Sequence, residues 1–199
     1  MGDFGPDDQR GRLNLLTPEK VRLGLAEARE GILFCLSLPL DRPGGNKLNP
    51  RRYPPQLMAG QRGAQRNYDY PLSQDDPRWT DAVCDDAVLL WTQYSTQWDA
   101  LSHVGAEFDA DGNGIAERVY YNGFRAGDDV AVSKDAVADP APTGGPVRAG
   151  RLGIENMAAT CVQGRGVMID LHAAFGPGRR LVGYEDLASV CEAQNVAVE

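Results

Sequence analysis

The features that mark several common functional classes are missing from this sequence. Its 199 residues carry 20 Lys and Arg against 28 Asp and Glu, a formal net charge of −8, and no basic run stands out. A surface that binds nucleic acid or an anionic membrane needs a basic patch, so neither partner is expected. The apolar runs are too short to span a bilayer, and the N-terminal MGDFGPDDQR lacks the basic and apolar regions of a signal peptide. We therefore predict a cytoplasmic protein.

Cysteine is present but forms none of the usual spaced pairs. The sequence has no CxxC motif, and its four cysteines lie far apart: Cys35, Cys84, Cys161 and Cys191. Zinc ribbons and disulfide frameworks need closer spacing. Each cysteine lies in or beside an apolar stretch, where a free thiol behaves as a small hydrophobe. The signatures GxGxxG, GxxxxGK[ST], GxSxG and HExxH are also absent, which argues against the cofactor and hydrolase classes that they mark.

The apolar residues that are present predict strands alternating with helices. Thr17 followed by Pro18 is a typical helix start, and Gly31 is a reasonable stop. Short apolar runs at residues 32–38 and 167–171 predict buried strands, and helices are predicted over 150–162 and 184–194. With 42% hydrophobic residues the chain can bury one substantial core. The pattern predicts an α/β fold with a mixed sheet.

The domain organisation follows from composition. Residues 1–12 are rich in Gly, Asp and Arg and are expected to be flexible, so that a single domain covers 13–199. From 39 to 79 the chain is dominated by Pro, Gly, Asn, Arg and Asp. A long irregular segment in a domain is usually functional or disordered. We interpret it as an arm that wraps the domain or a neighbouring subunit, with a mobile surface loop as the alternative.

The most informative stretch is QYSTQWDALSH, residues 93–103, which holds one of the two histidines. The preceding apolar residues predict that it begins as a strand, in which side chains alternate between faces. Four polar side chains at odd-numbered positions then point the same way: Gln93, Gln97, Asp99 and His103. One strand could thus present oxygen and nitrogen donors to a metal, with a base at its end.

This stretch resembles the signature of the cyclase-type amidohydrolases, a family that includes bacterial kynurenine formamidase. The signature reads His-x-Gly-Thr-His-x-Asp-x-Pro-x-His, and without a gap it matches at Thr96, Asp99 and His103. A TQWDALxH form is typical of the longer bacterial branch, and similar flanking segments are GRLNLLTPEKV, FCLSLPLDRP, Asp85-Asp86, YYNGF and GRGVMIDL. The resemblance runs from about residue 11 to the end. It implies the swivelling β/β/α fold of that family, incomplete at the C-terminus.

The resemblance also implies a metal-dependent hydrolase or cyclase acting on a small amide, lactone or cyclic carbonyl compound. Asp99 corresponds to a metal ligand, and His103 to the general base, a role that suits imidazole because it titrates near neutrality. Gln93 and Gln97 stand where the family has histidines, and amide oxygens suit harder cations better than zinc. The expected cofactor is a divalent metal, Mn, Zn or Mg. The residues expected to contact substrate are Trp98, Tyr121 and Asn122.

Departures from the family pattern support a second hypothesis, a non-catalytic binding or assembly module or an inactive fragment on the same fold. Besides the two glutamines, the family takes a later His and Glu as ligands from a segment that this chain does not contain. The residues also have simpler interpretations: Asp99 caps a turn, His103 is structural and Trp98 packs. Because the family commonly assembles and the 39–79 arm suits exchange, we expect a homo-oligomer, a dimer or tetramer.

One further motif is a decoy. DADGNG at residues 109–114 resembles the start of a calcium-binding EF-hand loop, but the twelfth position is Tyr120 instead of the bidentate glutamate. An Asx- and Gly-rich turn between two strands explains the same residues. We predict a turn and do not expect calcium binding.

Overall fold

The computed structural model describes residues 2–132 and 147–197. The chain divides into two compact units. One unit comprises Met1–Ile32 with Val104–Glu199, and the other is Leu33–His103. The single domain expected over 13–199 stays a prediction, since a family domain can contain two such units. Each unit is described by itself.

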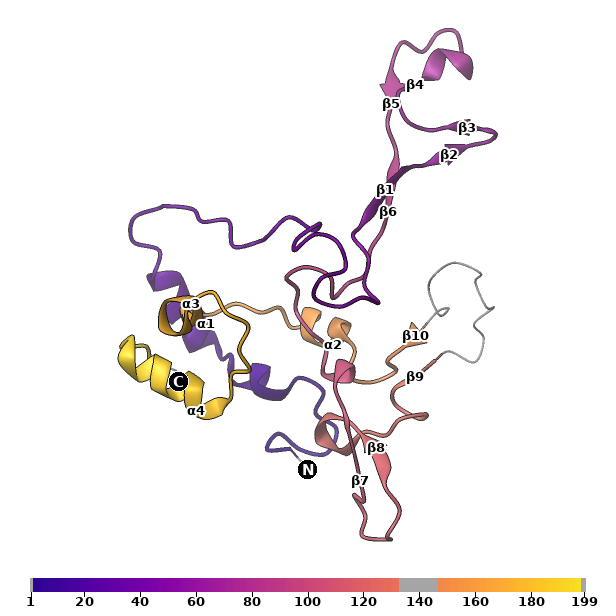
Figure 1. The fold of residues 1–199 in the computed structure, drawn as a ribbon. Helices are drawn as coiled ribbons and strands as arrows, with labels where there is room; N and C mark the ends of the chain where they lie inside the picture. The colour runs from indigo at the N-terminus through magenta and orange to yellow at the C-terminus, as the bar shows by residue number, and fades with distance from the viewer. Residues whose placement is uncertain (1, 133–146, 198–199) are drawn as a thin grey trace. The chain divides into compact units, whose positions relative to one another are not determined.

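The unit Leu33–His103 is built on a ladder of hairpin-like strand pairs (Figure 1). β1 (Gln56–Ala59) pairs antiparallel with β6 (Asp86–Leu89), with Gln56 opposite Leu89. Two shorter antiparallel pairs follow, β2 (Gln61–Arg62) with β3 (Gln65–Arg66), and β4 (Tyr70–Pro71) with β5 (Ala82–Val83). Two 3₁₀ helices complete it, Leu72–Gln74 and Leu101–His103. Part of the segment 39–79 thus forms short strands, while residues 39–55 have neither helix nor strand.

The other unit contains the α-helices. α1 (Pro18–Ala26) begins as predicted, because the Thr17 side chain accepts a hydrogen bond from the backbone N–H of Lys20. α2 (Ile154–Ala158), α3 (Leu171–Phe175) and α4 (Tyr184–Ala193) lie near the C-terminal end. The two helices predicted over 150–162 and 184–194 are therefore confirmed, the first in a shorter form. Gln194 ties α4 to α3, since its side-chain amide bonds both the N–H and the C=O of Asp170 at 2.9 and 2.7 Å.

This unit also holds 3₁₀ helices and two strand pairs. The 3₁₀ helices are Gly11–Leu15 and Tyr121–Gly123. β7 (Ala106–Phe108) pairs antiparallel with β8 (Glu117–Val119), and β9 (Ala131–Val132) with β10 (Val147–Arg148). The named strands that the structure describes all form antiparallel two-stranded sheets. The presence of both helices and strands confirms the α/β class. The predicted mixed sheet is wrong for these strands, because all of them pair antiparallel.

Two predicted strands do not form, and a third ends early. Residues 32–38 and 167–170 form neither helix nor strand, and Leu171 begins α3. Large side chains of both runs are exposed instead of buried, among them Leu33, Phe34 and Met168. The strand expected to lead into residue 93 ends at Leu89, because its partner β1 begins at Gln56. A strand needs a neighbour for its backbone groups, and a local apolar pattern does not supply one.

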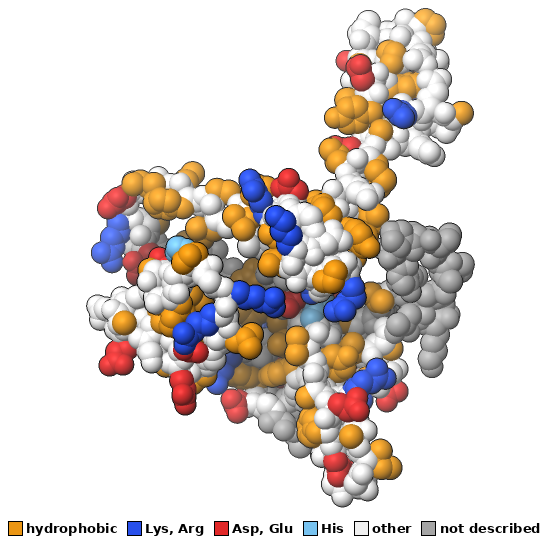
Figure 2. Space-filling view, viewed as in Figure 1, with side chains coloured by type: hydrophobic (Ala, Val, Ile, Leu, Met, Phe, Trp, Pro, Cys, Tyr) orange, Lys and Arg blue, Asp and Glu red, His pale blue; other side chains and the backbone are white. Residues whose placement is uncertain are grey.

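The buried apolar residues are few among those described, and each unit has its own. Leu152 is fully buried, accompanied in its unit by Val119, Phe124, Met157 and Val190. Tyr70, Tyr94 and Ala100 are buried in the other unit. Hydrophobic side chains are correspondingly frequent on the visible surface (Figure 2). Leu33 at 95% exposed and Leu181 at 92% are the extremes among the large ones.

Candidate functional site

The candidate site lies in the turn that follows β6. The chain reverses after Trp91, where the N–H of Tyr94 bonds the carbonyl of Trp91 at 2.9 Å. Tyr94 is buried and its hydroxyl donates to the carbonyl of Gly45 at 2.8 Å. The turn prevents β6 from continuing into the signature segment. The Tyr94 hydrogen bond holds the start of that segment against residues of the 39–55 stretch.

Further contacts hold the same turn. The Arg52 guanidinium donates to the backbone carbonyl of Gln93 at 2.6 Å, and the Ser95 hydroxyl donates to the carbonyl of Pro39 at 3.0 Å. The rings of Tyr53 and Trp91 lie with centroids 5.1 Å apart, a favourable tilted pair. The segment that looked irregular from composition therefore positions the signature turn.

His103, Asp99 and Gln93 come together after this turn. Asp99 and His103 are separated by one turn of chain that ends in the 3₁₀ helix Leu101–His103, and His103 Nδ1 lies 2.5 Å from Asp99 Oδ1. The amide nitrogen of Gln93 lies 3.4 Å from Nδ1 and 3.5 Å from Nε2 of the same imidazole. These last two distances are at the outer limit of a hydrogen bond. The His103 side chain is 38% exposed and that of Asp99 52%.

The contact defines what this imidazole can do chemically. A carboxylate accepts only, so a neutral His103 donates from Nδ1 to Asp99 and keeps the lone pair on Nε2. Nε2 is then the atom that can accept a proton. Both side chains are partly exposed, so part of the imidazole is accessible to a small molecule. The pair therefore has the arrangement of a base oriented by a carboxylate.

The donor chemistry also suits a weakly held cation. Asp99 offers a carboxylate, and Gln93 offers an amide oxygen when its side-chain amide rotates by about 180°. Oxygen donors of this kind fit Mg²⁺ or Mn²⁺. Among the described residues, three side chains of the His, Cys, Asp or Glu type lie close enough to hold a metal ion at Asp109, Asp111 and Glu117, and Asp99 is not part of this group. A cation here would complete its shell with water or with further donors.

The remaining predicted site residues of this segment lie apart from the trio. Gln97 is exposed and has no hydrogen bond with any residue that the structure describes. Trp98 is 65% exposed, so it does not pack into the core of its unit. The structure thus brings together three of the four residues that the alternating strand was expected to align, but through a turn and a 3₁₀ helix. A turn was not expected from the alternating pattern.

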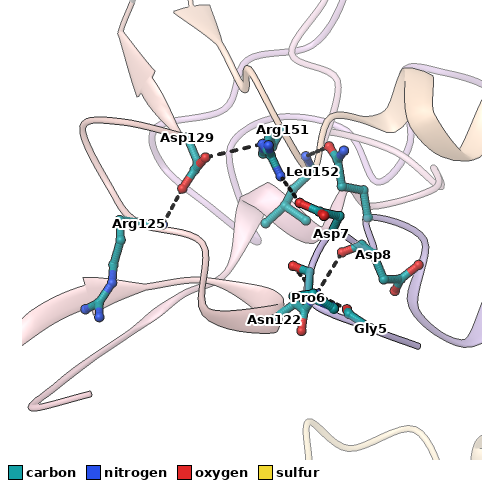
Figure 3. Close-up of polar contacts among 10 residues, drawn as sticks. Gly5, Pro6, Asp7, Asp8, Asn122, Arg125, Asp129, Arg151 and Leu152 are labelled. Atoms are coloured by element: carbon teal, nitrogen blue, oxygen red, sulfur yellow. Dashed lines mark hydrogen bonds and ion pairs between the residues drawn. The ribbon is translucent and has the colours of Figure 1, made fainter. Parts of the chain in front are cut away.

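Tyr121 and Asn122 belong to the other unit, where their polar groups bind the N-terminal segment. The Tyr121 hydroxyl donates to Asp8 Oδ2 at 2.7 Å. The Asn122 amide donates to the carbonyls of Gly5, Pro6 and Asp8 at 2.8, 3.1 and 3.2 Å (Figure 3). Asn122 adopts a positive φ of 59°, which asparagine tolerates better than most residues. The predicted contact of these two residues with substrate stays a prediction.

A second set of contacts completes the attachment of this segment. Arg151 lies 3.2 Å from Asp7 and 3.6 Å from Asp129, and the N–H of Leu152 donates to the Gln9 side chain at 3.1 Å (Figure 3). Residues 2–12 were expected to be flexible on composition alone, and in the structure they make these specific bonds. Sequence reasoning missed them because their partners lie more than 110 residues away. Flexibility itself is a statement about motion and stays a prediction.

The decoy loop forms the turn that was predicted. Residues 109–116 connect β7 to β8, and the Asp109 carboxylate accepts backbone N–H bonds from Gly112, Asn113 and Gly114 at 2.8–3.0 Å. The pKa of Asp109 is lowered, chiefly because the backbone N–H of Gly114 stabilises its ionised form. Desolvation acts in the opposite direction, and the N–H groups of Gly112 and Asn113 lower the pKa further. Ligand atoms of Asp109, Asp111 and Glu117 lie within 4.8 Å of one another. These bonds confirm the predicted turn, and the three carboxylates lie in it and at the start of β8.

A small cavity adjoins the candidate site. It has a volume of about 50 Å³ and is lined by Gln93, Tyr94 and the stretch before β1: Pro43, Gly45, Leu48, Asn49 and Arg52. This volume holds a water molecule or two and not a substrate. A substrate of His103 would therefore bind on the open side of the imidazole.

Comparison with known proteins identifies the family. In the described part of the chain no helix is long and apolar enough to cross a membrane. No curated protein matches the sequence. A solved crystal structure of a novel cyclase is 27% identical, with a TM-score of 0.59 over 99% of this chain, and this chain spans 56% of the length of that one. The family model described as putative cyclase matches residues 67–199. The match includes the QWDALSH segment and confirms the predicted resemblance, so the chain belongs to the putative cyclase family.

Proposed function

We propose that this protein is a metal-dependent hydrolase or cyclase acting on a small amide, lactone or cyclic carbonyl compound. The observation that carries the proposal is the 2.5 Å contact between His103 Nδ1 and Asp99 Oδ1 at the signature segment of a putative cyclase. Both side chains are partly exposed, so a small molecule can reach the imidazole. A purely structural role for the pair would need no such access.

The proposed mechanism assigns the proton transfer to His103. Asp99 holds Nδ1–H, so Nε2 accepts a proton from the attacking hydroxyl group or water and returns it to the leaving group. Gln93 lies within 3.5 Å of Nε2 and orients the ring or the substrate. A divalent metal held by Asp99 with amide oxygens would supply Lewis-acid polarisation of the carbonyl. Trp98, exposed beside Asp99 in sequence, is proposed to contact the substrate.

The test is the metal content of the purified protein. We expect Mn, Zn or Mg to co-purify with wild type and to be lost in Asp99→Ala. Asp111→Ala is the matched control, because it removes an exposed carboxylate of the β7–β8 turn. Hydrolysis of a panel of N-formyl amides and lactones should then require the metal and His103. Equal metal content in Asp99→Ala and wild type would refute the assignment of Asp99.

A second candidate function is a non-catalytic binding module on the same fold. Gln93 and Gln97 favour it, since they replace two imidazoles with weaker ligands. The two proposals differ in their response to a chelator. Ligand binding that survives metal removal, without turnover of any panel compound, would support the module.

A further inference from the structure

A large cavity, which we call the α1 cavity, lies within the unit formed by Met1–Ile32 and Val104–Glu199 and takes no part in the proposed function. Its volume is about 820 Å³. One wall is α1 with the 3₁₀ helix before it, and the other comes from the stretch after α2 and the first residue of α4 (Figure 1). Cavities of this size are typical of small-molecule sites.

Two glycines bring the walls of the α1 cavity into close contact. A Cβ atom at Gly24 of α1 would collide with the backbone of Gly164 and would lie 2.7 Å from the backbone nitrogen of Arg165. A Cβ atom at Gly164 would in turn lie 3.0 Å from Leu16 Cδ2. Because neither position has room for a side chain, the stretch that carries Arg165 and Val167 packs directly beside α1. The cavity is therefore bounded by segments that contact one another.

Positive side chains gather on the lining of the α1 cavity, although the chain as a whole has a net charge of −8. Arg12, Lys20 and Arg165 line it together with one carboxylate, that of Glu27, so positive charge is in excess there. The Arg165 guanidinium donates to the carbonyl of Ala197 at 3.3 Å, which positions it and uses one of its N–H groups. A concave lining with an excess of one sign attracts a ligand of the opposite sign.

The remainder of the lining is largely aliphatic. Leu15, Leu23 and Val167 are 44%, 49% and 44% exposed, and Leu16 lies between the two leucines in the same wall. Hydrocarbon placed against these side chains leaves water together with them, which is favourable. A ligand that complements the whole lining therefore needs an apolar body as well as a negative charge.

We infer that the α1 cavity binds a single-chain amphipathic anion. The anionic head lies against the guanidinium groups of Arg12 and Arg165, and the aliphatic chain lies along the leucine and valine side chains of the lining. Fatty acids and alkyl phosphates share this chemistry. The inference does not depend on His103, which belongs to the other unit, so it and the proposed function can fail separately.

The test is calorimetric titration of the full chain with decanoate, decyl phosphate, decylamine and decanol, each below its micellar concentration. The two anions should bind about tenfold more tightly than the amine and the alcohol, because the charge of the lining discriminates between head groups. Added salt should weaken binding of the anions and leave that of decanol unchanged. The affinities of decanoate and decyl phosphate then show which of the two heads the cavity prefers. Equal affinity for anions, amine and alcohol would overturn the inference.

Matched variants separate the α1 cavity from non-specific binding of amphiphiles. Arg165→Gln should weaken decanoate binding about fivefold, the upper range for a partly exposed ion pair. Arg22→Gln changes an exposed arginine of α1 that does not line the cavity and should leave binding unchanged. Leu23→Gln should weaken binding of the anions and of decanol alike, whereas Leu25→Gln, at a position of the same helix that is 61% exposed, should not.

Equal effects within either pair of variants would contradict the inference. Light scattering with and without decanoate checks the other occupant, a second copy of this chain. Dissociation of an oligomer on addition of decanoate would assign the cavity to that copy and overturn the inference, whereas an unchanged mass with saturable binding supports it.

Discussion

His103 Nδ1 lies 2.5 Å from Asp99 Oδ1, and this contact fixes which nitrogen of the neutral imidazole carries the proton. The neutral ring should therefore be the Nδ1–H tautomer, whereas free imidazole in water mixes both tautomers. Because the chain has only two histidines, ¹⁵N spectra of labelled protein can be assigned readily. Asp99→Ala should move His103 toward the Nε2–H tautomer and leave His172 unchanged.

The same variants give an activity prediction once a substrate is found. His103→Ala should lower kcat/KM by about 10²–10⁴-fold, the usual contribution of a general base. Asp99→Ala should also lower it, because the base loses its orientation.

Unchanged ¹⁵N shifts of His103 in Asp99→Ala would show that the contact does not set the tautomer.

Tyr121→Phe removes the hydroxyl that donates to Asp8 at 2.7 Å. The free energy of unfolding should fall by about 1 kcal/mol, the typical net value of one hydrogen bond, as measured by urea denaturation. Amide exchange in residues 2–12 should rise with it. Tyr120→Phe is the matched control, since the Tyr120 hydroxyl bonds no residue in the described part of the chain. An equal effect of both variants would argue against the attachment.

The pH dependence of this attachment follows from the same pair. Partial burial, followed by the hydrogen bond to Asp8, raises the pKa of Tyr121 from 10.0 to about 12. In the unfolded chain Tyr121 loses its proton near pH 10, whereas in the folded protein it keeps the proton to about pH 12. The stability contributed by the Tyr121 hydroxyl is therefore complete below pH 10 and is lost between pH 10 and 12. Tyr121→Phe should remove this loss. A wild-type stability profile identical to that of the variant in this range would contradict it.

Asp186 should make α4 sensitive to acid. The N–H of Gly183 and then the Arg180 guanidinium, against a smaller desolvation effect, lower the pKa of this carboxyl below 3.8. The ionised Asp186 carboxylate stabilises the fold above pH 3.8. This contribution is lost as the pH falls below 3.8, because the carboxylate of the folded protein then becomes protonated and loses these interactions. Asp186→Asn should raise amide exchange in the first turn of α4 at neutral pH. Glu185→Gln, one position earlier in the same turn, should not.

Local signals in the sequence predicted two local elements correctly, the start of α1 and the turn after β7. The Thr17 cap and Pro18 fix the start of α1 within a few residues, and the Asx-Gly turn at 109–116 forms from the Asp109 carboxylate and neighbouring N–H groups. Both depend on contacts between residues close in the chain, so composition and spacing are sufficient. The signature segment likewise indicated the family.

The sequence by itself determined the helices α1, α2 and α4, the turn at Asp109 and the family. Only the tertiary structure decided that Leu89 ends the strand, that Tyr94 reaches Gly45, and that Tyr121 and Asn122 hold residues near the N-terminus. These contacts join residues 33 to 117 positions apart. An apolar run such as residues 33–38 likewise becomes a strand only beside a partner, because its backbone groups are satisfied by another segment and not by their neighbours in sequence.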